Sequence, residues 1–196
     1  MKLAIFDFDG TITKSDSFRG FIIFYHGYHR FILGVLATLP SLVLYWLNLI
    51  SNNNMKQRVI THFFKGESAN KFRDLAEKYS NNKISNIIRD EAIDKINWHK
   101  KSDDEVVIVS ASIDVWLKPW CDKNAIKLIS TEIEIKENKI TGKLIGRNCW
   151  GPEKVKRIKS LYNLEEYSEI HVYGDSRGDK EMMELADESY FKPFRD

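Results

Sequence analysis

Apolar residues follow two patterns along the chain, and these patterns divide it between strands and helices. Uninterrupted apolar runs at 3–6, 106–109 and 170–173 predict three buried strands, and 128–129 adds a shorter one. Between the runs, apolar residues recur every three or four positions, which predicts helices that bury one face. Strands and helices that alternate in this way predict an α/β domain with a mainly parallel sheet.

A long helical block, residues 14–98, interrupts this alternation directly after the first strand. Within it, apolar residues recur with a helical period, and one such stripe runs through positions 84, 87, 88, 92 and 96. We therefore expect two units. One is a core made of 1–13 and 99–196, and the other is a helical insert, 14–98.

The second half of the chain predicts shorter elements around the later strands. Helices are predicted over 115–123, 152–162 and 179–186 from their apolar spacing. Residues 132–146 instead alternate apolar and polar side chains around Glu137-Asn138-Lys139. That alternation around a polar centre predicts a small β-hairpin.

The composition indicates a folded protein without a strong charge bias. Of 196 residues, 43% are hydrophobic and 12% aromatic, and 30 Lys and Arg face 28 Asp and Glu, for a formal net charge of +2. This balance gives no reason to expect nucleic acid as a partner. Two cysteines, Cys121 and Cys149, do not suggest a disulfide framework, so we expect a cytoplasmic protein with Cys149 as a small buried residue. Asp7 and Asp9 interrupt the N-terminal apolar run where a secretory signal would have to continue.

The stretch 31–50 contains no charged residue, and its length matches the ~20 apolar residues of a membrane-spanning helix. Residues 18–50 are too few for two spans, which need about 40 residues. One span would leave Asp7 on the opposite side of the membrane from the later strands. Pro40 is expected to kink or end a helix within the stretch.

Two interpretations of this apolar stretch remain. Its helices are either buried in the insert or face a partner. Alternatively, residues 18–50 form a hairpin that lies on the inner membrane surface, with Tyr25, Tyr45 and Trp46 near the lipid headgroups.

Polar residues gather where the predicted strands end. Asp7 and Asp9 follow the first strand, and Ser110 ends the second. The third strand ends in 174–179, which reads Gly-Asp-Ser-Arg-Gly-Asp, and Lys154 begins the helix before it. Because open α/β sheets bind ligands at the carboxyl ends of their strands, we expect these side chains to form one site.

This arrangement resembles the haloacid dehalogenase (HAD) superfamily over almost the whole chain. Residues 7–11, Asp-Phe-Asp-Gly-Thr, match its first motif, Ser110 the second, Lys154 the third and 174–179 the fourth. The insert after the first motif is similar to the C1 cap of the subfamily that includes phosphoserine phosphatases. The resemblance implies a Rossmann-like core, a helical C1 cap and a phosphatase that acts on a small phosphorylated substrate.

The resemblance also implies a role for each motif residue. Asp7 is implied as the nucleophile that forms an aspartyl-phosphate, and Asp9 as the acid and base that serves the leaving group and then water. Ser110 and Lys154 are implied to hold the phosphate oxygens. Thr11 and Ala111 belong to the same implied phosphate-binding set.

A magnesium ion is the implied cofactor, because Mg²⁺ prefers oxygen ligands. The implied ligands are Asp7, the backbone carbonyl of Asp9 and Asp175, with Asp179 as an outer or alternate ligand.

Taken one at a time, the residues of these motifs have simpler interpretations. Asp7 and Asp9 would suit a turn after a strand, Lys154 a solvated helix, and Asp179 a helix start. A phosphate-binding module without catalytic activity, and phosphotransfer to a second substrate, are the other functional alternatives.

Substrate specificity is implied to reside in the cap. Asp16 and Arg58 resemble the cap residues that hold the amine and carboxylate of phosphoserine. Residues 110–112 read Ser-Ala-Ser, which departs from the Ser-Gly-Gly of phosphoserine phosphatases. The apolar cap and residues 148–154 also resemble C-type phosphatidylglycerophosphatases, which makes a phospholipid phosphate the alternative substrate. The sequence leaves the oligomeric state open.

Overall fold

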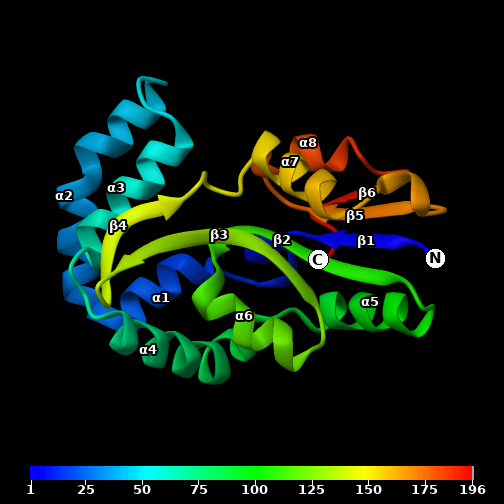
Figure 1. Cartoon of the computed structure of the whole chain (residues 1–196), viewed down its shortest axis with the longest axis horizontal. Helices are drawn as coiled ribbons and strands as arrows, with labels where there is room; N and C mark the ends of the chain where they lie inside the picture. Colours follow the sequence, from blue (N-terminus) through cyan, green and yellow to red (C-terminus); the bar gives the residue numbers. More distant parts are fainter. Residues whose placement is uncertain (196) are drawn as a thin grey trace.

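One six-stranded sheet organises the protein, which we describe from a computed structural model over residues 1–195. The strand order is β4-β3-β2-β1-β5-β6 (Figure 1). The strands are β1 (Leu3–Phe6), β2 (Glu105–Ile113), β3 (Lys127–Lys136), β4 (Lys139–Ile145), β5 (Ile170–Gly174) and β6 (Glu188–Phe191). All neighbours pair in parallel except β3 and β4, which form the predicted hairpin. The mainly parallel α/β fold is confirmed, and β6 is a strand that the sequence patterns did not predict.

Helices cover both faces of this sheet (Figure 1). Alternate residues of β1 point to opposite faces, so Ala4 and Phe6 join one buried cluster while Leu3 and Ile5 join the other. The helices around the core strands are α5 (Asp90–Lys101) and α6 (Asp114–Lys123) on the first face, and α7 (Pro152–Leu161) and α8 (Lys180–Met183) on the second. Short helical turns complete the core: η1 (Phe8–Ile12), η3 (Leu164–Glu166) and η4 (Arg177–Asp179).

The strand order of the sheet reverses at β1. The chain proceeds from β1 to β2 and β3 on one side, whereas β5 and β6 lie on the other. Phe6, the last residue of β1, pairs with Ile108 of β2 and with Tyr173 of β5. The carboxyl ends of three strands therefore meet at one point, which is where such sheets bind ligands.

The helical insert leaves and re-enters the core at neighbouring points. It contains α1 (Ser17–His26), α2 (Tyr28–Trp46), α3 (Asn52–Phe64), α4 (Ala69–Asn82) and the turn η2 (Ile84–Ile87). The Lys14 backbone N–H donates to the carbonyl of Ile87 at 2.6 Å, and that of Arg89 donates to Ile12 at 2.8 Å. These bonds hold the two connecting segments side by side.

The period of the apolar stripe at positions 84–96 predicted one helix, but the structure does not have a single helix there. The stripe is divided between η2 and α5, and Ile88 between them is extended. Ile88 pairs with Thr13 in an antiparallel bridge, and that pairing needs an extended backbone. α5 also runs across the predicted boundary at 98/99, and His99 packs against Phe6 of the sheet. The division into core and insert stays a prediction.

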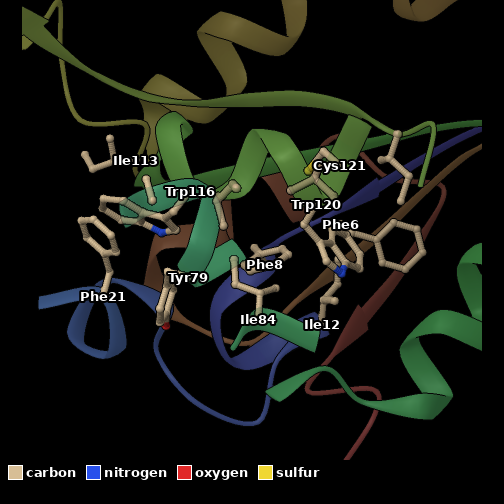
Figure 2. Close-up of a cluster of buried hydrophobic side chains, with 14 of the residues drawn as sticks. Phe6, Phe8, Ile12, Phe21, Tyr79, Ile84, Ile113, Trp116, Trp120 and Cys121 are labelled. Carbon is tan, nitrogen blue, oxygen red and sulfur yellow. The ribbon is translucent and has the colours of Figure 1, made fainter. Parts of the chain in front are cut away.

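The insert and the core share a hydrophobic cluster. Figure 2 shows Phe21, Tyr79 and Ile84 of the insert in the same cluster as Trp116 and Trp120 of α6. The rings of Phe21 and Trp116 stack with their centroids 4.6 Å apart. The insert is therefore packed into the same core as the sheet.

The β3–β4 hairpin reaches the insert as well. The Ala69 N–H donates to the carbonyl of Asn138 at 2.9 Å, and the Gly66 N–H donates to that of Ile140 at 2.8 Å. Glu137 and Asn138 both have positive φ angles, 48° and 58°, as a tight hairpin turn requires. The hairpin tip thus holds the loop between α3 and α4.

The apolar stretch 31–50 is largely exposed, so the alternative in which it is buried in the insert is wrong. Most of it lies in α2, where Gly34 is the one buried residue. By length and composition α2 could cross a membrane, and 6% of its apolar window is buried. Pro40 does not end the helix, which continues to Trp46. Pro40 removes one N–H from the helical hydrogen bonds and crowds the carbonyl of Leu36, and α2 nevertheless continues on both sides of it.

Removing the Trp116 side chain should test the shared cluster. Trp116 is fully buried against Phe21, so we expect Trp116→Ala to lower the free energy of unfolding by about 3–5 kcal/mol in urea denaturation. The matched control is Trp46→Ala, since Trp46 is 74% exposed and its loss should change stability by less than about 0.5 kcal/mol. Equal losses in the two variants would contradict the packing described here.

Candidate active site

A cavity of about 420 Å³ lies at the carboxyl ends of β1, β2 and β5. Both the core and the insert contribute to its walls. The core side chains around it include those of Asp7, Asp9, Ser110, Lys154, Asp175 and Asp179. From the insert come Asp16, Phe18 and Lys56. The sequence-predicted set at the strand ends is therefore brought together in one place.

Lys154 lies at the floor of the cavity. It is 1% exposed, and its Nζ donates to Asp7 Oδ1 at 2.6 Å, to Asp179 Oδ1 at 2.7 Å and to the Val109 carbonyl at 2.7 Å. Gly151 and Pro152 place it in the first turn of α7, since proline suits the first position of a helix. Burial alone lowers the pKa of Lys154, but the charges of Asp7 and Asp179 raise it above its ordinary value. Lys154 is thus a fixed ammonium ion and not a solvated helix residue.

Asp7 is the first residue after β1, and its own backbone N–H donates to the Tyr173 carbonyl at 2.9 Å. One oxygen, Oδ1, faces Lys154, while Oδ2 accepts a long 3.4 Å bond from the Thr11 hydroxyl. Burial raises the pKa of Asp7 to about 8 despite the nearby ammonium. Thr11 is 1% exposed and contacts Asp7 without lining the cavity, so it supports the carboxylate.

Asp179 is held by several donors at once. Its Oδ2 accepts from the Ser176 N–H at 3.0 Å, the Ser176 hydroxyl at 2.8 Å and the Asp175 N–H at 3.2 Å. Although burial raises the pKa of Asp179, Lys154 holds it below its ordinary value. Both its oxygens are therefore occupied, and Asp179 orients its neighbours in addition to favouring the start of its helical turn.

Asp175 is the least satisfied carboxylate of the site. Its Oδ1 is buried without a hydrogen-bond partner in the described structure, and its Oδ2 pairs with Arg195. Burial and the charge of Asp179 raise its pKa. Gly10, with φ +84°, lies against it, since a Cβ there would come within 2.4 Å of Asp175 Oδ2. The turn after β1 thus needs glycine both for its backbone angle and for space.

The donor set fits a hard divalent cation. Asp7, Asp175 and Asp179 each offer an oxygen, and these atoms lie within 4.8 Å of one another. Three carboxylates, of which Asp7 and Asp179 are buried and Asp175 is partly buried, face two cations, Lys154 and Arg195, which leaves one negative charge uncompensated. A cation near the unpartnered Asp175 Oδ1 would offset that charge, and oxygen ligands suit Mg²⁺.

Asp9 points away from this carboxylate cluster and toward the insert. Its Oδ1 accepts from the Ser17 N–H at the start of α1 at 2.6 Å, and its Oδ2 accepts from the Ser112 hydroxyl. Burial, with the charge of Asp16, raises the pKa of Asp9 to about 6. Asp9 and Asp7 therefore occupy different surroundings, although they are only two residues apart.

The segment after β2 forms the opposite wall. The Ser110 hydroxyl accepts from the Ser112 N–H at 3.0 Å, and both residues line the cavity. The Ala111 carbonyl accepts from the Lys56 ammonium at 2.7 Å, which ties α3 of the insert to the core. Lys56 Nζ also lies 4.5 Å from the centre of the Phe18 ring. Burial lowers the pKa of Lys56.

The two specificity residues that the resemblance implied have different positions. Asp16 lines the cavity and caps α1, accepting from the Arg19 N–H at 2.6 Å. Arg58 is exposed and donates to Ser41 of α2 at 3.0 Å, so it is not at the site. Lys56, two residues earlier on α3, occupies the cavity instead. A helix turns about 200° over two residues, so these side chains point in nearly opposite directions.

Three further residues at the site were not predicted from the sequence. Ser112 was visible only as the second serine of Ser-Ala-Ser, and its contact with Asp9 joins residues 103 positions apart. Lys56 lies two residues before Arg58, to which the resemblance implied the substrate contact. Arg195 donates to the Gly10 carbonyl at 3.0 Å as well as to Asp175, and no motif surrounds it. Cys149 is buried, as predicted, and burial raises the pKa of its thiol to about 11.

Comparisons of the sequence with known proteins identify the family of this chain. The family model of haloacid dehalogenase-like hydrolases matches residues 4–184. The CicA protein of Caulobacter vibrioides is 31% identical over 195 residues, which cover 98% of this chain and 86% of CicA.

Solved structures share the fold at lower identity. A protein of unknown function from Bordetella pertussis superposes with a TM-score of 0.82 at 18% identity, covering 96% of this chain and 88% of that one. A phospho-aspartyl intermediate analogue of phosphoserine phosphatase superposes with a TM-score of 0.69 at 15% sequence identity, covering 96% of this chain and 84% of that one. The family match extends over most of the chain and includes every residue of the four motifs. This chain belongs to the haloacid dehalogenase-like hydrolases.

Proposed function

We propose that this protein is a Mg²⁺-dependent phosphatase that cleaves phosphomonoesters through an aspartyl-phosphate on Asp7. The observation that carries the proposal is the placement of Lys154, which is buried between Asp7 and Asp179 at the floor of the cavity. A fixed ammonium beside a carboxylate nucleophile reduces its repulsion toward a phosphate dianion. The phospho-aspartyl analogue of phosphoserine phosphatase, a structural neighbour, supports the same chemistry.

The reaction divides into two displacements. Asp7 Oδ2, whose hydrogen bond from Thr11 is long, attacks phosphorus, and the bond from phosphorus to the leaving alcohol breaks. Asp9 gives its proton to the leaving oxygen. In the second step Asp9 takes a proton from water, which attacks phosphorus and releases phosphate and free Asp7. The bonds from Ser17 and Ser112 keep the Asp9 carboxyl beside the cavity during both steps.

Mg²⁺ would stabilise charge on the transferring phosphoryl group when bound. Asp7, the Asp9 carbonyl and Asp175 would hold it, since Asp175 Oδ1 is free to accept a ligand bond. Asp179 would act from outside, because both its oxygens already accept hydrogen bonds. Ser110 and Lys154 would hold the non-bridging phosphate oxygens, with the Ala111 segment beside them.

The insert side of the cavity determines which phosphate enters. Lys56 and Phe18 offer a cation and an aromatic face, and Asp16 adds one carboxylate. A small phosphorylated metabolite is the first candidate, in a cytoplasmic enzyme. A phospholipid phosphate is the second, favoured by the exposed apolar α2. A phosphate-release screen with phosphoserine, sugar phosphates, nucleotides and phosphatidylglycerophosphate separates these candidates from each other.

Replacing the nucleophile should abolish turnover. We expect Asp7→Asn to lower the rate of phosphate release from p-nitrophenyl phosphate by at least about a thousandfold, because an amide cannot form the acyl-phosphate. The control Asp122→Asn removes a carboxylate from an exposed salt bridge on α6 and should leave the rate unchanged. Full activity of Asp7→Asn, or of the wild type in excess EDTA, is incompatible with the mechanism.

Metal binding should depend on Asp175. Mg²⁺ titrated into the wild type should raise the thermal unfolding temperature, because a ligand that binds only the folded state stabilises it. Asp175→Asn should weaken the apparent Mg²⁺ affinity at least about tenfold, measured by calorimetry or by the same thermal shift. An Asp175→Asn variant with wild-type Mg²⁺ affinity would remove Asp175 from the ligand set.

Lys56, and not Arg58, should control substrate affinity. On a substrate with a second anionic group, Lys56→Gln should raise KM about tenfold, because a charge-assisted hydrogen bond is lost at the cavity. Arg58→Gln is the matched control on the same helix and should leave KM within about twofold, because Arg58 contacts Ser41 outside the cavity. The reverse ranking would restore the role that the sequence implied for Arg58.

A further inference from the structure

The outward face of α2 carries an apolar stripe with no partner among residues 1–195. Its members recur with a helical period and are between 42% and 74% exposed: Ile32, Leu33, Leu36, Leu39, Val43 and Trp46. We call this set the α2 stripe. Soluble surfaces seldom leave such a continuous apolar row uncovered, so the stripe indicates a binding surface.

The inner face of α2 is fixed to the rest of the insert. Gly34 lies so close to α3 that a Cβ there would come within 2.1 Å of the Phe63 ring. Ser41 accepts a bond from Arg58, also on α3. α3 runs back beside α2 (Figure 1), and its buried residues Ile60 and Phe64 belong to the common core. Because α2 packs on α3 along one side, its opposite side is the one that can lie on a surface.

The segment that carries the stripe contains basic residues and no acidic ones. Residues 17–66 contain no Asp or Glu, and they hold basic residues at 19, 30, 56, 58 and 65. The whole chain has 30 basic and 28 acidic residues, so the remainder is net acidic. Arg30 at the start of α2 and Lys65 after α3 are exposed. Residues 17–66, which include the apolar face, therefore carry the net positive charge of the chain.

The basic residues near the stripe distinguish between two candidate binding partners, a second copy of this chain and an anionic lipid surface. A second copy, related by the usual two-fold symmetry, would place one basic surface against the same basic surface. An anionic lipid surface would instead offer acyl chains to the stripe and negative headgroups to the basic residues. Tyr28 and Trp46, 62% and 74% exposed at the two ends of α2, are residues that favour the headgroup region.

We propose that α2 docks this protein onto an anionic lipid bilayer. The stripe enters the boundary between headgroups and acyl chains, and α2 lies parallel to the membrane plane. Arg30 and Lys65 contact anionic headgroups. The docking is independent of the catalytic chemistry, since no member of the stripe lines the cavity.

Vesicle flotation tests the proposal with the full chain. The protein should float with phosphatidylcholine vesicles that contain phosphatidylglycerol, bind pure phosphatidylcholine vesicles more weakly, and release as salt rises. Leu36→Gln should weaken binding to the anionic vesicles about tenfold. Arg30→Gln should weaken it about fivefold and leave binding to the neutral vesicles unchanged. The matched control Leu161→Gln changes a leucine on α7 that is more exposed than Leu36, 68% against 58%, and should bind as the wild type does.

Three results would overturn the proposal. The first is no flotation with anionic vesicles, and the second is equal binding by the Leu36→Gln and Leu161→Gln variants. The third is a stable dimer in sedimentation equilibrium that Leu36→Gln dissociates, since the stripe would then cover a second copy. Hydrolysis of p-nitrophenyl phosphate should be unchanged in Leu36→Gln, so a failure of docking is distinguishable from a failure of the phosphatase chemistry.

Discussion

The buried ammonium of Lys154 is the contact on which the site depends. It donates to Asp7 after β1, to Asp179 after β5 and to the Val109 carbonyl in β2, so one atom joins three strands at their carboxyl ends. A lysine buried to this degree is stable only while its carboxylate partners are present. The reversal of strand order at β1 makes this geometry available, because it brings β2 and β5 to opposite sides of Asp7. Removing Lys154 would leave adjacent buried carboxylates without compensation.

The insert completes the site and does not simply cover it. Asp9 accepts from Ser17 at the start of α1, and Lys56 of α3 donates to the Ala111 carbonyl. The aromatic cluster around Phe21 and Trp116 joins the same helices to the core. Any movement of the insert would therefore change the surroundings of Asp9 and the width of the cavity together.

Helix α3 connects the two surfaces that matter for function. Its inner face places Lys56 in the cavity, while Arg58 faces α2 and Phe63 packs against Gly34. The proposed membrane surface and the phosphate site thus lie on opposite sides of one helix. A bilayer-bound enzyme would hold its cavity at a defined distance from the lipid headgroups, which suits either a lipid phosphate or a soluble one produced near the membrane.

The sequence by itself determined the parallel sheet, the hairpin and the core of the site. Apolar runs that end in Asp7, Ser110 and Gly174 locate strand ends, and strand ends of a parallel sheet meet. Only the tertiary structure decided between Lys56 and Arg58, because both suit an exposed helix and only packing sets its rotation. It also placed the hydroxyl of Ser112 on Asp9, ended the helical stripe at Ile88 and left α2 uncovered. These outcomes depend on contacts between distant segments, which local periodicity does not encode.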